Sequence, residues 1–91
     1  MTRDRLPNRR HAETFTFEHD GVRYVCTVGR FPDGRLGEIF IDGSKVGSAV
    51  GLHAQDAAVL ASLLLQHGVH ASTIRHSIAG PIATALAMVV R

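Results

Sequence analysis

The first half of the chain alternates apolar and polar residues in short runs. From Glu13 to Glu18, Phe15 and Phe17 fall on one face and threonines on the other, which is the period-2 pattern of an amphipathic strand. Asp20-Gly21 then favours a tight hairpin turn. The alternation resumes from Val22 to Val28. These segments predict two antiparallel strands that share one apolar face, with the single cysteine of the chain pointing inward.

A second turn joins this strand to a third. Pro32 fixes φ at the first turn position and Gly34 accepts a positive φ, so the chain folds back on itself here. The segment Leu36–Ile41 carries apolar residues on both faces, as a central or interface strand does. We therefore expect an antiparallel meander of three strands, or of four if a short piece around Lys45 and Val46 joins it.

The second half of the chain has helical periodicity. A long helix is predicted from Ser48 or Val50 to His67, with Gly68 as its terminator. One stripe of this helix should pack on the sheet. Other apolar residues lie off that stripe, and an exposed helix of a monomer would not tolerate them. We expect this second face to meet the C-terminal helices or another subunit. The stripe residues are Val50, Ala54, Ala57, Ala58, Ala61, Leu64 and Leu65, and the others are Leu52, Val59, Leu60 and Leu63.

Two short helices should complete the fold. They are expected over Ala71–Ala79 and Ile82–Val90, because Gly80-Pro81 ends one helix and starts the next. The predicted fold class is α+β, with a three- to four-stranded antiparallel β-meander packed by one long and two short C-terminal helices. Residues 13–91 would form one domain, preceded by a flexible basic arm over residues 1–12.

Composition narrows the range of functions. A chain of 91 residues with 45% hydrophobic and 20% charged residues is typical of one small globular domain, whose core is marginal unless oligomerisation adds to it. No apolar run is long enough to span a membrane, and the basic opening segment lacks the apolar core of a secretory signal. We expect a cytoplasmic homo-oligomer with no membrane contact. Its net charge of only +2, concentrated in the strand-rich half, argues against a nucleic-acid polymer as partner.

Positive charge and backbone donors gather around the third predicted strand. Two arginines flank the turn before it, and a Gly-Ser-Lys-Val-Gly-Ser segment follows it ahead of the long helix. Guanidinium groups and helix N-termini both bind anions, although turns, caps and surface ion pairs use the same residue types. We predict an anion or nucleotide site with phosphate contacts and one stacking aromatic ring. Its ligand-binding residues would be Arg30, Phe31, Arg35, Lys45, Gly47 and Ser48.

Other chemistry finds little support in the residues. The six histidines show no metal-binding spacing, and Cys26 has the phase of a core residue. Ser62 and Ser77 lie in predicted helices without a nucleophile elbow. We therefore expect no catalytic residues, no metal and no cofactor, and we interpret the chain as a binding protein and not an enzyme.

Several motifs resemble one known family. Gly34-Arg35, Gly37–Phe40 and Leu65–Val69 are similar to the TSCPD-type domain at the C-terminal end of cobalamin-dependent (class II) ribonucleotide reductases, and to its small stand-alone relatives. The resemblance spans about Ala12 to Ile78. The Thr-Ser-Cys-Pro-Asp tetrapeptide and the C-terminal cysteine pairs of full reductases are absent. The resemblance implies a detached accessory module, and no reductase residue carries over to this chain.

Two functions follow as hypotheses. In the first, an oligomer binds a nucleotide or a cyclic nucleotide-derived signal without turnover. The architecture resembles that of bacteriophage anti-Thoeris and anti-CBASS proteins, which are sponges that sequester immune second messengers, so this version places the protein in the host cytoplasm as an anti-defence factor. In the alternative, the chain is an accessory or regulatory module related to class II ribonucleotide reductase that acts by protein–protein contact.

Overall fold

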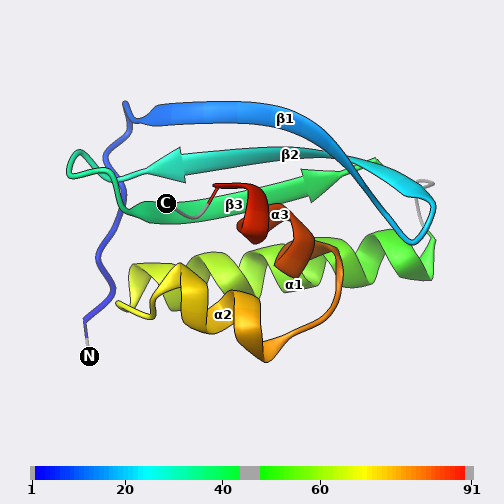
Figure 1. The fold of residues 1–91 in the computed structure, drawn as a ribbon. Helices are drawn as coiled ribbons and strands as arrows, with labels where there is room; N and C mark the ends of the chain where they lie inside the picture. The colour runs from blue at the N-terminus through cyan, green and yellow to red at the C-terminus, as the bar shows by residue number, and fades with distance from the viewer. Residues whose placement is uncertain (1, 44–47, 90–91) are drawn as a thin grey trace.

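A computed structural model describes residues 2–43 and 48–89 of the chain. Three strands come first along the chain and three helices follow (Figure 1), so the predicted α+β class is confirmed. Residues 44–47, Ser-Lys-Val-Gly, lie outside the described residues. The possible fourth strand around Lys45 and Val46 is therefore not described. The elements are β1 (His11–His19), β2 (Val22–Arg30), β3 (Leu36–Asp42), α1 (Ala49–Gln66), α2 (Ala71–Ser77) and α3 (Pro81–Val89).

The strands form one antiparallel sheet in the order β1-β2-β3. Phe15 pairs with Cys26 across β1 and β2, and Val28 pairs with Ile39 across β2 and β3. The apolar positions of the alternating pattern therefore share one face, as predicted. The register of the second pair shifts between Gly29 and Arg30, which is the kind of irregularity that bends a strand end and re-aims a side chain.

Both turns take the conformations that their residues favour. Asp20 and Gly21 have φ values of 50° and 76°. A type I′ hairpin turn requires positive φ at both of these positions. Gly34 has φ of 94° in the second turn. That turn is closed by hydrogen bonds from the Phe31 N–H to the Arg35 carbonyl, at 2.8 Å, and from the Gly34 N–H to the Phe31 carbonyl, at 2.9 Å.

The helices cover one face of the sheet. Helix α1 packs along β3, while α3 contacts β1 and packs against α2 (Figure 1). The core between the two layers includes Val28 and Ile39 of the sheet and Ile82 and Leu86 of α3, each at most 1% exposed. Burying one such side chain contributes roughly 1.5–3 kcal/mol. Sheet and helices therefore stabilise each other through a shared apolar layer.

Only part of the α1 stripe that was predicted to pack on the sheet does so. Of the predicted stripe, Ala54, Ala58, Ala61 and Leu65 are buried and Ala57 is half-buried. Val50 and Leu64 are 55% and 45% exposed, so the prediction that they pack on the sheet is wrong. The buried face instead includes Ser62 and Gln66, whose polar groups bond the backbone of β3. A hydrophobicity pattern does not mark polar residues that have a buried partner.

The opposite side of α1 lies open to solvent in the described structure. We call Leu52, Val59, Leu60, Leu63 and Leu64 the α1 outer face; Leu63 is half-buried and the other members are 45–62% exposed. The C-terminal helices were one of the two covers expected for this face, and they do not cover it: α3 contacts β1 and α1, and α2 packs against α3, while four of the five residues stay exposed. Coverage by another subunit stays a prediction. No described helix combines the length and the hydropathy that crossing a bilayer demands.

The segment before β1 runs past the ends of the strands toward the C-terminal end of α1 (Figure 1). The Asp4 N–H donates to the Gln66 carbonyl at 2.6 Å, and the Arg3 Nε donates to the Gln66 side-chain oxygen at 2.6 Å. Leu6 is half-buried against Gly37. These contacts hold residues 3–6 against the domain. The charge and the terminal position of this segment had predicted a flexible arm.

Candidate functional site at the end of the β2–β3 hairpin

Arg30 is at the end of β2, where its side chain turns inward. It is buried, and its donors reach three different elements: Nε bonds the Glu13 carboxylate at 3.0 Å, Nη1 the Gly34 carbonyl at 2.9 Å and Nη2 the Val89 carbonyl at 3.0 Å. This guanidinium ties β1, the turn and α3 together. Its position therefore serves the fold, and most of its hydrogen-bonding capacity is used within the chain.

Arg35 presents the exposed cation at this end. Its side chain is 56% exposed and its guanidinium lies 4.6 Å from the centroid of the buried Phe31 ring, a cation–π distance. Nε bonds Asp33 at 2.7 Å and Nη2 lies 3.4 Å from Asp4. Phe31 therefore already stacks with a side chain of its own turn. Arg35 is held in place and still reaches solvent.

Asp33 and Arg35 stabilise each other's charged forms. The Arg35 backbone N–H and then its side chain, both bonded to the carboxylate, lower the pKa of Asp33 from its usual range. The same side-chain hydrogen bond raises the pKa of Arg35. Both groups are thus ionised at neutral pH, and an incoming anion would have to compete with Asp33 for this cation.

The remaining predicted ligands lie elsewhere. Lys45 and Gly47 fall outside the described residues. Ser48 caps α1, where its hydroxyl accepts a hydrogen bond from the Gly51 N–H at 3.0 Å, so it plays the alternative role considered from the sequence. It follows β3, whereas Arg35 precedes it, and a strand of 7 residues is about 20 Å long. The structure brings Arg30, Phe31 and Arg35 together and leaves Ser48 at the other end of the sheet.

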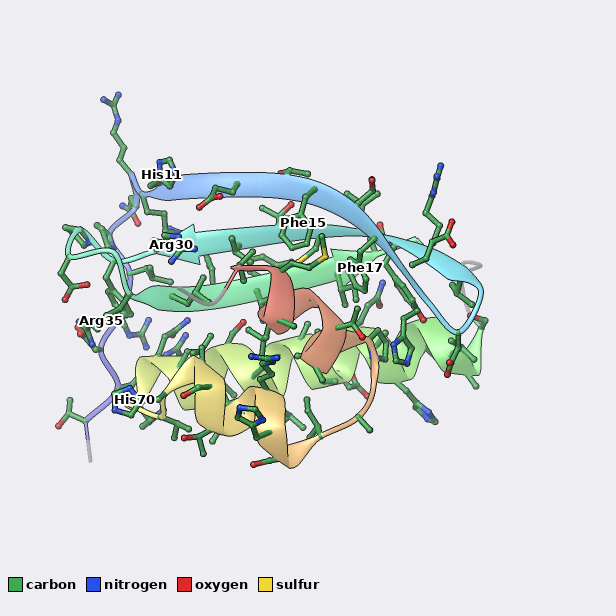
Figure 2. The ribbon with its side chains drawn as sticks, viewed as in Figure 1. His11, Phe15, Phe17, Arg30, Arg35 and His70 are labelled. Carbon is green, nitrogen blue, oxygen red and sulfur yellow. The ribbon has the colours of Figure 1, made fainter. Side chains whose placement is uncertain are left out.

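A hollow of about 540 Å³ opens beside Arg35, between the hairpin turn and the junction of α1 with α2. Figure 2 shows Arg30 and Arg35 at this end of the sheet, with His70 on the helical layer below them. Apolar side chains contribute to its lining along with the charged groups. We call it the Arg35 hollow; its lining comprises Arg30, Asp33, Gly34, Arg35, Leu36, Leu65, Gly68, Val69, His70, Ala71, Ser72 and Val89.

Sequence reasoning did not anticipate the helical half of this hollow. His70 and Ser72 lie more than 30 residues after Arg35 in the chain, and they reach it only because α1 runs back along β3. No local motif marks them. A second hollow, of about 370 Å³, lies on the other side of the turn, and Arg9, Arg10, His11 and Pro32 contribute to its lining.

Two groups that could act as nucleophiles, Cys26 and Ser62, are shielded or engaged. Burial raises the pKa of the Cys26 thiol to about 12, so it stays protonated at neutral pH. The Ser62 hydroxyl bonds both backbone groups of Ile39. Within residues 2–43 and 48–89, no group of three or more His, Cys, Asp or Glu side chains is placed to hold a metal ion. The hollow and its exposed arginine are suited to binding an anion.

Comparison with known proteins identifies relatives of this chain. The model of the TSCPD domain family matches residues 2–86. Vitamin B12-dependent ribonucleotide reductases are similar in sequence: that of Agrobacterium fabrum is 43% identical over 67 residues, covering 74% of this chain and 5% of the reductase. That of Rhodopirellula baltica is 41% identical over 70 residues, covering 74% and 6%. That of Streptomyces coelicolor is 35% identical over 71 residues, covering 78% and 7%. No solved structure matches the chain.

Proposed function

The chain belongs to the TSCPD domain family, and we propose that it is a non-catalytic accessory module that acts by protein–protein contact. The chain spans only 5–12% of the length of the curated relatives it matches. In those reductases a matching segment of about this size is therefore joined to a much longer polypeptide. The proposed partner is a vitamin B12-dependent ribonucleotide reductase. Both proteins would lie in the cytoplasm.

The α1 outer face is the observation that supports this role. Leu60 is 62% exposed, Val59 52% and Leu52 51%, and Asp56 is the one formally charged residue of the helix. A contiguous exposed apolar patch marks an interaction site, whereas apolar residues scattered singly over a surface do not. Removal of this apolar surface from water favours association. Contact with a larger protein would cover a surface that the domain leaves open.

The environments of Cys26, Ser62 and Asp33 support the non-catalytic part of the proposal. The Cys26 thiol is buried and protonated, and the Ser62 hydroxyl bonds the backbone. Asp33 is engaged with Arg35. A module with these features would modulate or position its partner without carrying out a reaction of its own.

Binding to the reductase tests the proposal directly. Purified chain and a vitamin B12-dependent ribonucleotide reductase from the same organism would be mixed and analysed by size-exclusion chromatography. We expect co-elution, its loss in Leu60→Glu, and its retention in Ile78→Glu. Ile78 is also exposed, at 43%, but lies after α2, so it controls for the added charge. Separate elution of the two wild-type proteins, or equal binding by both variants, contradicts the proposal.

The Arg35 hollow supports a second candidate, binding of a nucleotide or nucleotide-derived phosphate. Its volume of about 540 Å³ falls within the range of small-molecule sites. Arg35 would hold the phosphate, while Leu36, Leu65 and Val69 would contact the apolar part of the ligand. In its sharpest form the ligand is a cyclic nucleotide immune signal and the protein a phage sponge. Arg35 and the hollow favour an anion and do not distinguish among these ligands.

Calorimetric titration would test this second candidate. The panel would contain cyclic dinucleotides, cyclic trinucleotides, cyclic ADP-ribose isomers and dATP. Arg35→Ala should abolish binding, and Arg75→Ala, which removes an exposed arginine from α2, should not. Recovery of the ligand unchanged after heat release would exclude hydrolysis. Silence across the panel removes this candidate and leaves the protein-contact proposal standing.

A further inference from the structure

One edge of the sheet is covered by a helix and the other edge is open. Helix α1 covers the β3 edge: Ser62 bonds both backbone groups of Ile39, and the Gln66 amide donates to the Gly37 carbonyl at 2.8 Å. Strand β1 forms the other edge, and it pairs only with β2 among the described elements (Figure 1). Phe17 is the one residue of β1 that is fully buried. An open row of backbone donors and acceptors is a template for another strand.

Strand β1 also lacks most of the features that discourage such pairing. Proteins protect exposed edges with charged side chains, especially lysine, and with proline, short strands or bulges. The inward-facing charge of β1 is Glu13, and Arg30 of the same chain binds it at 3.0 Å. The 9 residues of His11–His19 include no lysine, proline or glycine. Their pairing with β2 continues without a shift from His11–Arg30 to His19–Val22. The strand is therefore regular along its whole length and suited to extending the sheet.

We infer that β1 pairs antiparallel with β1 of a second copy of this chain, about a two-fold axis at Thr16. The result is one continuous sheet of twice the width, with both helical layers on the same side. Side chains that face each other across an antiparallel pair must lie on the same face of the sheet. Only registers in which a residue on the axis meets its own copy satisfy both this condition and the symmetry.

The charges and rings of β1 select the axis at Thr16. In this register Glu13 faces the partner's His19, and Phe15 faces the partner's Phe17, each pair occurring twice by symmetry. Within its own chain Glu13 binds Arg30, and the Nδ1 of His19 bonds the Thr84 hydroxyl at 2.8 Å. The aromatic pair is a favourable cross-strand combination, and a carboxylate can accept a hydrogen bond from an imidazole N–H. Phe15 is only half-buried within one chain, so the contact would bury more of its ring. On the solvent face, Thr14 lies opposite the partner's Glu18.

Neighbouring registers lose these combinations. An axis at Phe15 places Glu13 against the partner's Phe17. An axis at Thr14 places Glu13 against the partner's Phe15. Both arrangements set a carboxylate against an aromatic ring and separate it from His19. An axis at Phe17 pairs only residues 15–19 of the two strands and leaves Glu13 beyond the end of the partner's strand. The sequence of β1 is thus self-complementary in one register, which is the property that an isologous contact requires.

Matched lysine substitutions on the solvent face test the register. Thr16→Lys places two lysines opposite each other across the axis and should raise the dimer dissociation constant roughly fivefold. Thr14→Lys places each lysine opposite a Glu18 and should lower it by a similar factor. Both residues are exposed on the same strand face. Thr14 also shares a hydrogen bond with the Thr27 hydroxyl at 3.1 Å, so the stability of each variant monomer is measured in urea alongside. Sedimentation equilibrium of the full chain measures the constants.

Cysteine cross-linking adds a second readout. Thr16→Cys should form an intermolecular disulfide on mild oxidation, since cross-strand neighbours come close to disulfide spacing, whereas Thr14→Cys should not. The native Cys26 is fully buried and leaves the assay undisturbed. A single-chain mass of 9.8 kDa at every concentration, or the same response of both lysine variants, overturns the inference. Leu60→Glu should leave the dimer intact, so failure of the reductase contact and failure of the dimer are distinguishable.

Discussion

The hydroxyl of Ser62 accepts a hydrogen bond from the Ile39 N–H at 2.9 Å and donates one to the Ile39 carbonyl at 3.0 Å. One side chain on α1 thereby satisfies both outward-pointing backbone groups of a residue in an edge strand. Both residues are buried, so no bulk water is available as a substitute partner. This contact joins the helical layer to the edge of the sheet.

Replacing Ser62 with alanine should destabilise the domain. The change leaves the Ile39 N–H and carbonyl buried without these partners, and such a loss costs about 1–3 kcal/mol. The free energy of unfolding in urea measures it. Ser72→Ala, at an exposed position of α2, is the matched control and should stay within about 0.5 kcal/mol of the wild type. Equal stability of the two variants would show that the hydrogen bonds contribute nothing net.

Gly29 provides the space for the Glu38 side chain. A Cβ atom at this position would lie 2.2 Å from the Glu38 Oε2 and 2.7 Å from its Cγ, and Glu38 is itself held by an ion pair with Arg10. Gly29→Ala should therefore cost about 1–3 kcal/mol, the usual effect of overpacking. Gly80→Ala, where nothing lies within 4 Å of the added atom, should have little effect. Thermal unfolding followed by circular dichroism compares them.

The Cys26 thiol should make stability depend on alkaline pH. Its pKa is raised by burial to about 12 in the folded chain, compared with roughly 8.5 when unfolded. A raised folded pKa means that the stabilisation is complete below the unfolded pKa and is lost as the pH rises toward the folded value. The free energy of unfolding should thus fall by about 1.4 kcal/mol for each pH unit across this window. Cys26→Ala, although less stable at pH 7, should show a shallower slope.

Thiol reactivity provides an independent check of the same pKa. Native protein at pH 8 should react with a thiol-specific reagent far more slowly than protein unfolded in urea, because the thiolate is the reactive species. Rapid labelling of folded protein would mean that the strand opens or that Cys26 is less enclosed than its 0% exposure indicates.

The two arginines of the hairpin should differ sharply when each is changed to alanine. Arg30→Ala removes hydrogen bonds to Glu13, Gly34 and Val89 from a buried position, and we expect a loss of roughly 2 kcal/mol or more. Arg35→Ala removes exposed ion pairs, which contribute little to stability because solvent screens them. Denaturant titration would rank them. The reverse order would assign the structural role to Arg35.

The strands and turns could be predicted because their signals are local. The alternation of Phe15 and Phe17 and the Asp20-Gly21 turn depend on residues that are neighbours in the chain. The roles of Ser62 and Arg30 could not be predicted in this way. Ser62 meets a strand 23 residues earlier, and Arg30 meets a carbonyl 59 residues later. Polar residues with distant partners leave no periodic trace.

The candidate site shows the same limit. Arg30, Phe31 and Arg35 were predicted together because one turn holds them, and that proximity is local. The link to Ser48 assumed that segments on either side of β3 come together, whereas a strand keeps its two ends apart. His70 entered the site through helix packing alone. Only the part of the site within a single turn was accessible from the sequence.

The fork of hydrogen bonds around Arg30 connects the first strand of the chain with the last helix through one guanidinium. If α3 separated from the sheet, the buried guanidinium of Arg30 would lose its hydrogen bond to Val89, and its contact with Glu13 would weaken at the same time. Amide protons of α3 and β1 should therefore exchange with solvent through a common opening event, and the domain should melt as one cooperative unit with no early fraying of its final helix.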